Sequence, residues 1–140
     1  MNLRTLQRTV LLLTTLLVAS CASDAERARG GDRNLASADL EGADLSGANL
    51  AGADLHNAHM TSANLAGANL TGANLNSAYL TGANLTGANL TGADVSWADL
   101  TGANLTGANT TAIRCNFATR WPSGSSCTSP RCSFSHPTCP

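Results

Sequence analysis

Residues 78–107 read AYLTGANLTGANLTGADVSWADLTGANLTG, and this stretch decides the fold. The same five-residue unit runs in strict register from Ala38 to Gly107, as Ala, Asp or Asn, Leu, a small residue and Gly. Among the fourteen units Ala is first in all fourteen, Leu is third in twelve and Gly is fifth in ten. A period of five fits neither a helix nor a long strand. We number the positions of the unit one to five.

Each unit is predicted to form one short extended side followed by a corner. The residues at positions one and three point to the same face, and Asp or Asn between them points outward. Gly at position five permits a turn that a residue with a Cβ would resist. One such side cannot bury its Leu alone, so the units must stack, which predicts a solenoid.

These A(D/N)LXX units resemble the pentapeptide-repeat family. The resemblance implies an all-β fold, a right-handed quadrilateral β-helix with four units per coil and about four coils, over residues 35–112. It also implies a narrow interior filled by Leu and Ala. We expect Asn ladders between coils to add stability, and we expect the two ends to be weak because each exposes an unpaired coil.

Residues 1–20 are predicted to be a signal peptide. Two arginines precede an apolar run, Val10 to Ala19, which is too short to span a bilayer. The sequence Val-Ala-Ser-Cys that ends at Cys21 resembles a bacterial lipoprotein lipobox, which implies a lipidated Cys21. The alternative is an ordinary signal cleaved after Ala22. Both interpretations place the mature chain outside the cytoplasm.

With a lipidated Cys21, the chain is predicted to be anchored to a bacterial membrane on its periplasmic or cell-surface side. Residues 21–34 are then the lipidated N-terminus and a flexible tether, because they are small, polar and mixed in charge.

Residues 113–140 are predicted to form an irregular Cys-rich C-terminal cap. Residues 118–124 resemble the aromatic-Pro-x-Gly segment that often follows pentapeptide repeats, with Phe117 and Trp121 as apolar lids over the last coil. Four cysteines in an exported chain predict two disulfides of unknown pairing, namely Cys115, Cys127, Cys132 and Cys139. A zinc site that includes His136 is the alternative, but no Cys-x-x-Cys motif supports it.

The sequence shows no arrangement of residues that is typical of an enzyme. A nucleophile beside a histidine would need an orienting group and a desolvating cleft, which a solenoid surface does not supply. We therefore predict no catalytic residue, no cofactor and no metal. The formal net charge of −1 gives no electrostatic reason to expect nucleic acid as a partner.

Departures from the repeat gather on two adjacent sides of the predicted square. With twenty residues per coil, one side holds Leu35, Leu55, Leu75 and Val95, and the next holds Leu40, Met60, Leu80 and Leu100. The candidate binding corner between them comprises His56, Asn57, His59, Tyr79, Trp97 and Asp99. Aromatic side chains of this kind are enriched at binding hot spots. Duplication of a twenty-residue ancestor would space the departures in the same way.

These observations predict a non-enzymatic lipoprotein of the bacterial envelope, either a rigid scaffold or a protein-binding module for an unknown envelope protein. The family resemblance implies one alternative, an acidic mimic of DNA that acts on DNA gyrase. The repeats hold six acidic residues and no basic one, but the export signal and the many neutral Asn residues argue against mimicry. The sequence does not predict the oligomeric state.

Overall fold

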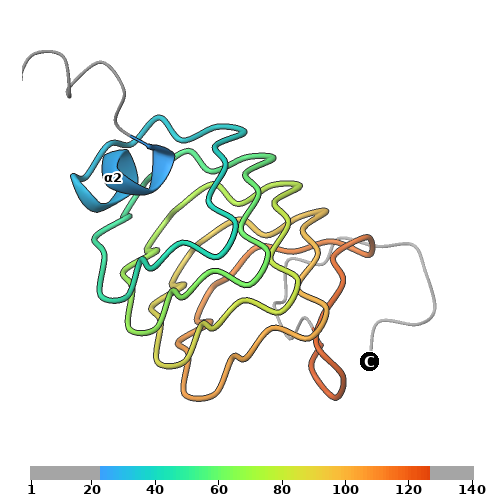
Figure 1. The fold of residues 1–140 in the computed structure, drawn as a ribbon. Coiled ribbons are helices and arrows are strands. Elements are labelled where there is room, and N and C mark those ends of the chain that lie inside the picture. Colours follow the sequence, from blue (N-terminus) through green and yellow to red (C-terminus); the bar gives the residue numbers. More distant parts are fainter. Residues whose placement is uncertain (1–22, 127–140) are drawn as a thin grey trace, which may run out of the picture.

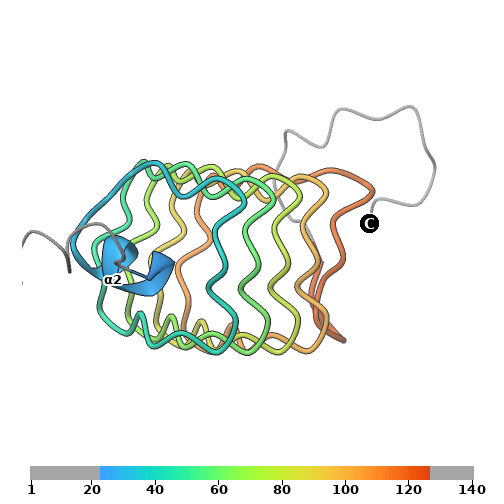
Figure 2. The same ribbon diagram turned by 45° about the horizontal axis from the view of Figure 1, so that its top comes forward.

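The computed structural model describes residues 23–126, which form a square solenoid with one helix at its N-terminal end (Figures 1 and 2). This helix, α2, spans Asp24–Arg29. The coils pair through isolated parallel bridges, one residue per side, and no longer strand is formed within the described residues. The all-β prediction is therefore correct for the coils and wrong for α2.

Several predictions fall on residues that the structure does not describe. The signal peptide, residues 1–20, lies outside the described residues. The same is true of these side chains: Cys21, Cys127, Cys132, His136 and Cys139.

The bridges confirm a coil of twenty residues. They align the outward residues at position two into four columns, which we name by their first members. The Asn34 column is Asn34, Asp54, Asn74, Asp94 and Arg114; the Asp39 column is Asp39, His59, Tyr79, Asp99 and Arg120; the Asp44 column is Asp44, Asn64, Asn84 and Asn104; the Asn49 column is Asn49, Asn69, Asn89 and Asn109.

Local hydrogen bonds explain why the five-residue unit folds in this way. The N–H of Ala73 donates to the carbonyl oxygen of Leu70 at 3.0 Å, which closes a turn over Gly72. Gly72 has a φ of +64°, and a type II turn requires such a positive φ at its third residue. The side-chain Oδ1 of Asn69 accepts the N–H of Thr71 at 3.1 Å. Position two is therefore Asp or Asn because its side chain supplies a local acceptor at the corner.

The interior contains the residues at positions one and three, as predicted. Leu70 and Leu75, in the middle of the stack, are both fully buried. The alanines at position one of each unit from Ala53 to Ala98 are buried as well. The last repeat coil is less closed, because Leu105 and Ala108 are only partly buried.

The prediction of a flexible tether over residues 21–34 is wrong for residues 23–34. Ser23 and Glu26 form a capping box that begins α2: the N–H of Ser23 donates to Glu26 Oε2 at 2.9 Å, and the N–H of Glu26 donates to Ser23 Oγ at 3.3 Å. Ala28, on the inner face of the helix, is fully buried in the core. The helix therefore closes the N-terminal end of the solenoid.

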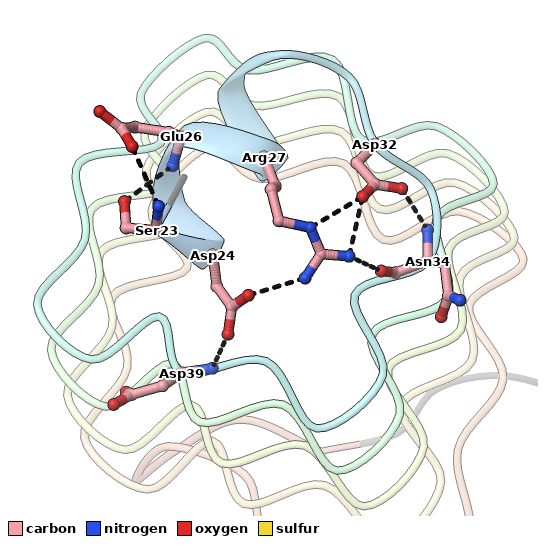
Figure 3. Close-up of polar contacts among 7 residues, drawn as sticks. All are labelled: Ser23, Asp24, Glu26, Arg27, Asp32, Asn34 and Asp39. Carbon is pink, nitrogen blue, oxygen red and sulfur yellow. Dashed lines mark hydrogen bonds and ion pairs between the residues drawn. The ribbon is translucent and has the colours of Figure 1, made fainter. Parts of the chain in front are cut away.

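Arg27 ties α2 to the first coil (Figure 3). Its guanidinium donates to Asp24 and Asp32, each at 2.8 Å, and to the carbonyl oxygen of Asn34 at 2.7 Å. Asp24 in turn accepts the N–H of Asp39 at 2.9 Å. We expect an unpaired edge at the N-terminal end of the solenoid. In the structure, however, these bonds pair polar groups of α2 with polar groups of the first coil.

The C-terminal part follows the coil path beyond the predicted boundary at residue 112. Bridges continue to Arg114 and Arg120, and the last step is twenty-one residues because the final unit contains one more residue. Trp121 packs against the core, as expected of a lid, whereas Phe117 is 71% exposed, so its prediction as a lid is wrong. Cys115 is buried and disulfide-bonded. The pairing of the four cysteines remains a prediction, because the other three lie outside the described residues.

Candidate functional site

The predicted columns of outward side chains exist. The bridges Asp39↔His59, His59↔Tyr79 and Tyr79↔Asp99 place these four residues one above another on one wall of the solenoid. The rings of His59 and Tyr79 stack with their centroids 4.9 Å apart and an interplanar angle of 24°. Tyr79 remains 48% exposed.

The stacked pair replaces local hydrogen bonds of the repeat. At consensus units Asn Oδ1 accepts the N–H two residues later, as Asn84 does from Thr86 at 3.1 Å. His59 and Tyr79 have no such oxygen close to the backbone, and among the described residues no partner accepts the N–H of Thr61 or Thr81. The two rings are therefore present at the expense of two bonds that stabilise the unit.

Trp97 lies at the adjoining edge of the square in an unfavourable backbone conformation. It has a φ of +64° at position five, where ten of the fourteen units have Gly. Its N–H donates to Asn116 Oδ1 at 3.1 Å. Its ring meets that of Phe117 edge to face, with centroids 5.6 Å apart at 65°. Trp97 is 56% exposed, so the strained residue is in large part open to solvent.

Sequence reasoning missed the role of Phe117 at this surface. The signal was available, since Phe117 follows Trp97 by twenty residues, which is the coil period. We define the aromatic corner as the side chains of His59, Tyr79, Trp97 and Phe117. It contains all three large hydrophobic residues that are exposed in the described part of the chain.

His56 and Asn57, the remaining members of the candidate binding corner besides Asp99, lie beside this surface. His56 Nδ1 is 3.0 Å from Asp54 Oδ1, on the wall of the Asn34 column. The hydrogen bond from His56 lowers the pKa of the Asp54 carboxyl. Asn57 occupies position five of the same edge as Trp97, with a φ of +56°. His56 is thus held by Asp54 and does not join the stacked rings.

Two arginines at the C-terminal ends of the columns neutralise neighbouring carboxylates. Arg114 pairs with Asp94 at 3.1 Å and Arg120 pairs with Asp99 at 3.3 Å. Hydrogen bonding by Thr101, followed by that of Arg120, lowers the pKa of Asp99. The part of the wall around Tyr79 and Trp97 therefore carries paired rather than isolated charges.

The surface around the aromatic corner offers groups suited to recognition. Within residues 23–126 no group of three His, Cys, Asp or Glu side chains is arranged to hold a metal ion. In the same part of the chain no helix has the length and hydropathy needed to cross a membrane. The surface offers exposed rings beside amides, hydroxyls and ion pairs, which suits recognition of a partner surface.

Known proteins with this repeat resemble the chain in sequence and in fold. The family model for pentapeptide repeats matches residues 38–76 and 68–107, with eight copies. A solved pentapeptide repeat protein from Nostoc PCC 7120 is 38% identical, with a TM-score of 0.65 over 69% of this chain and 79% of that chain. A pentapeptide repeat protein from the thylakoid lumen of Arabidopsis thaliana is 34% identical, with a TM-score of 0.50 over 56% of this chain and 58% of that one.

A third solved structure is far more distant. QnrB1, a plasmid-mediated fluoroquinolone resistance protein, is 17% identical with a TM-score of 0.26 over 59% of this chain and 64% of its own, which is too weak to carry an argument. No curated protein matches the sequence.

The family match spans half of the chain, and the Nostoc protein shares both the fold and more than a third of the aligned residues. The stacked units of five residues agree with both findings. The chain therefore belongs to the pentapeptide repeat family, whose members form right-handed β-helices.

Proposed function

We propose that this chain is a non-enzymatic binding module of the bacterial envelope, anchored through a lipid on Cys21. In this proposal a solenoid of about four coils is the rigid part, and the Cys-rich C-terminal segment closes its second end. The observation that carries the proposal is the aromatic corner. It places exposed rings on one edge, at positions where the repeat otherwise has Asn or Gly.

A functional surface explains why unfavourable residues persist at this edge. Trp97 occupies a left-handed conformation that costs about 1–3 kcal/mol for a residue with a Cβ. The stacked rings of His59 and Tyr79 take the place of local acceptors. Binding energy is the compensation that we propose, since strain concentrates at functional sites.

The anchor is tested by replacing Cys21 with Ser. The native protein is expected in the membrane fraction with a mass increase from acyl chains, and the variant is expected in the soluble envelope fraction. An unmodified mature N-terminus in the native protein would contradict the anchor.

The binding surface is tested separately by site-specific photo-crosslinking in the producing cell. A photoreactive residue at position 79 is expected to give a specific adduct, with protein or with lipid, whereas the same residue at Thr86, on the wall of the Asp44 column, is expected to give none. Equal labelling at the two sites would show that the corner is an inherited pattern without a binding role.

Mimicry of DNA is the alternative, and the structure offers it little support. A mimic needs an extended acidic surface, but the Asn49 column is amide throughout, and Asp94 and Asp99 are paired with arginines. The mature chain is expected to leave DNA supercoiling by purified gyrase unchanged. Inhibition at micromolar protein would favour the alternative.

A further inference from the structure

The aromatic corner has the composition of a surface that lies at a lipid interface. Its exposed rings include Tyr79 and Trp97, at 48% and 56% exposure, with Phe117 against Trp97. Tyr and Trp favour the boundary between headgroups and acyl chains, because each joins an apolar body to a polar tip. Two neighbouring acidic residues, Asp94 and Asp99, are paired with arginines, which lowers the cost of bringing them to that boundary, whereas Asp39 beside His59 forms no ion pair within the described residues.

The chain enters the solenoid at the top of the wall that carries these rings. Asp24 accepts the N–H of Asp39, and both residues lie on the same side of the first coil (Figure 3). Asp39 is the first member of the column that continues through His59 and Tyr79. The N-terminal end of α2 and the stacked rings therefore belong to one side of the molecule.

The proposed lipid lies very close to this entry point. Cys21 precedes Ser23, the first residue of the cap, by two residues, which span at most about 7 Å. Ser23 itself is fixed by the capping box, and Arg27 fixes the helix to the coil. A fourteen-residue tether would let the solenoid move away from the bilayer, whereas a lipid on this short link would hold the N-terminal end of the solenoid, where the Asp39 wall begins, close to it.

We propose that the aromatic corner is a second membrane contact, so that the solenoid lies on the bilayer along this edge. Tyr79 is two bridges from Asp39, about 10 Å along the stack, and Trp97 is about one coil further. The lipid at the N-terminal end of the solenoid and the rings further along the stack then meet the surface of the same bilayer. The inference rests on the proposed function and names its binding surface: a lipid bilayer, where the lipid anchor and the rings act together.

The first test measures the contact without the anchor. The mature chain, residues 21–140 with Cys21→Ser, is floated with phosphatidylcholine vesicles. Tyr79→Asn and Trp97→Gly restore the residues that the repeat prefers, so both variants are expected to fold. Together they are expected to weaken the partition into vesicles by about tenfold. The reason is that the substitutions remove the apolar area that the two half-exposed rings would bury in the bilayer. Thr86→Ala, on the wall of the Asp44 column, is the control and is expected to leave the partition unchanged. Equal partition of all variants, or none by the parent chain, would overturn the proposal.

The second test measures the orientation of the anchored protein. The lipidated chain with Trp121→Phe keeps Trp97 as its single tryptophan and is placed in vesicles that contain brominated acyl chains. Quenching of Trp97 is expected. A matched chain with Trp97→Gly, Thr86→Trp and Trp121→Phe is expected to show none. Equal quenching of the two, or none at either site, would overturn the proposed orientation.

The two tests also separate this inference from the proposed function. An unlipidated Cys21 in the native protein would contradict the anchor, and the flotation test would still decide whether the corner binds lipid. Crosslinking from position 79 to a protein, without lipid adducts, would replace the bilayer by a protein partner. Shielding of Trp97 from a soluble quencher in the absence of vesicles would show that the chain itself covers the corner, and would equally overturn the proposal.

Discussion

The walls of the Asp44 and Asn49 columns and the walls that meet at the aromatic corner share one backbone but carry different side chains. Both have the same twenty-residue register, and both have a positive φ at every fifth position. At the edge that leads to Trp97, however, each such position from Ser37 onward has a Cβ. The comparison shows that inter-coil bonding fixes the coil, while the outward side chains at positions two and five can change only at a local cost in hydrogen bonding or backbone strain.

The shared interior should respond most strongly to change. Leu70 is fully buried behind the wall of the Asn49 column. Leu70→Lys is expected to cost about 3 kcal/mol or more and to unfold neighbouring coils, because it buries a charge without a partner. Thr81→Lys, at an exposed position, is the control. Chemical unfolding that shows similar midpoints for both variants would mean that the interior tolerates charge.

The next prediction transfers the strained residue of the corner to a consensus edge. Gly72 has the same φ as Trp97, +64°, and open space around an added Cβ. Gly72→Trp is expected to lower the free energy of unfolding by about 2 kcal/mol, because the cost lies in the backbone conformation rather than in a clash.

Gly72→Asn is the control for that substitution and should cost less, since Asn tolerates a positive φ better than other residues with a Cβ. Asn57 already adopts this conformation. Equal thermal denaturation midpoints for Gly72→Trp and the parent chain would show that Trp97 carries no strain.

A smaller gain is expected from returning the stacked rings to consensus. The double variant His59→Asn, Tyr79→Asn restores acceptors for the N–H groups of Thr61 and Thr81. Each hydrogen bond contributes about 1 kcal/mol, and the lost ring contact removes a similar amount. The net gain in stability is therefore expected to be about 0.5–1 kcal/mol. A clear loss on chemical unfolding would indicate that the rings stabilise the fold.

The smallest effect concerns acid sensitivity beside the corner. Hydrogen bonding from His56 lowers the pKa of Asp54 from its ordinary value of 3.8. A lowered folded pKa stabilises the fold above pH 3.8, and this stability is lost as the pH falls through the folded pKa. His56→Asn is therefore expected to lose less stability than the parent chain between about pH 5 and about pH 3. Carbon NMR titration of the Asp54 carboxyl gives the direct measurement, and an unchanged pKa in the variant would contradict the assignment.

The repeat, together with the four units per coil that the family resemblance implies, is enough to predict the columns of the solenoid, because a strict period of five in a square coil leaves no freedom in register. His59, Tyr79 and Asp99 can therefore be aligned from their spacing of twenty residues. The helix α2 does not follow from the composition of residues 22–34, which is typical of a tether. The capping box formed by Ser23 and Glu26 is visible in the sequence, but the burial of Ala28 depends on the coil that it covers.

Phe117 shows where the repeat pattern is no longer enough to predict the structure. Its distance of twenty residues from Trp97 predicts proximity, yet the repeat pattern has already ended at residue 112. Whether the coil path continues there depends on long-range bonds such as that from Thr119 Oγ1 to the carbonyl oxygen of Val95, at 3.0 Å. The local sequence does not predict that bond.

The twenty-residue register also limits how such a chain can change in length. Deleting a single unit between Tyr79 and Trp97 would preserve the turn and the buried Leu of every remaining unit, yet it would move all later side chains by a quarter turn to the preceding wall. Trp97 and Phe117 would then leave the edge beside Tyr79, and Asp99 would leave the column of His59 and Tyr79, taking Arg120 with it. Insertion or deletion of whole coils leaves every remaining side chain on its own wall. Viable length variants of this chain should therefore differ by multiples of four units.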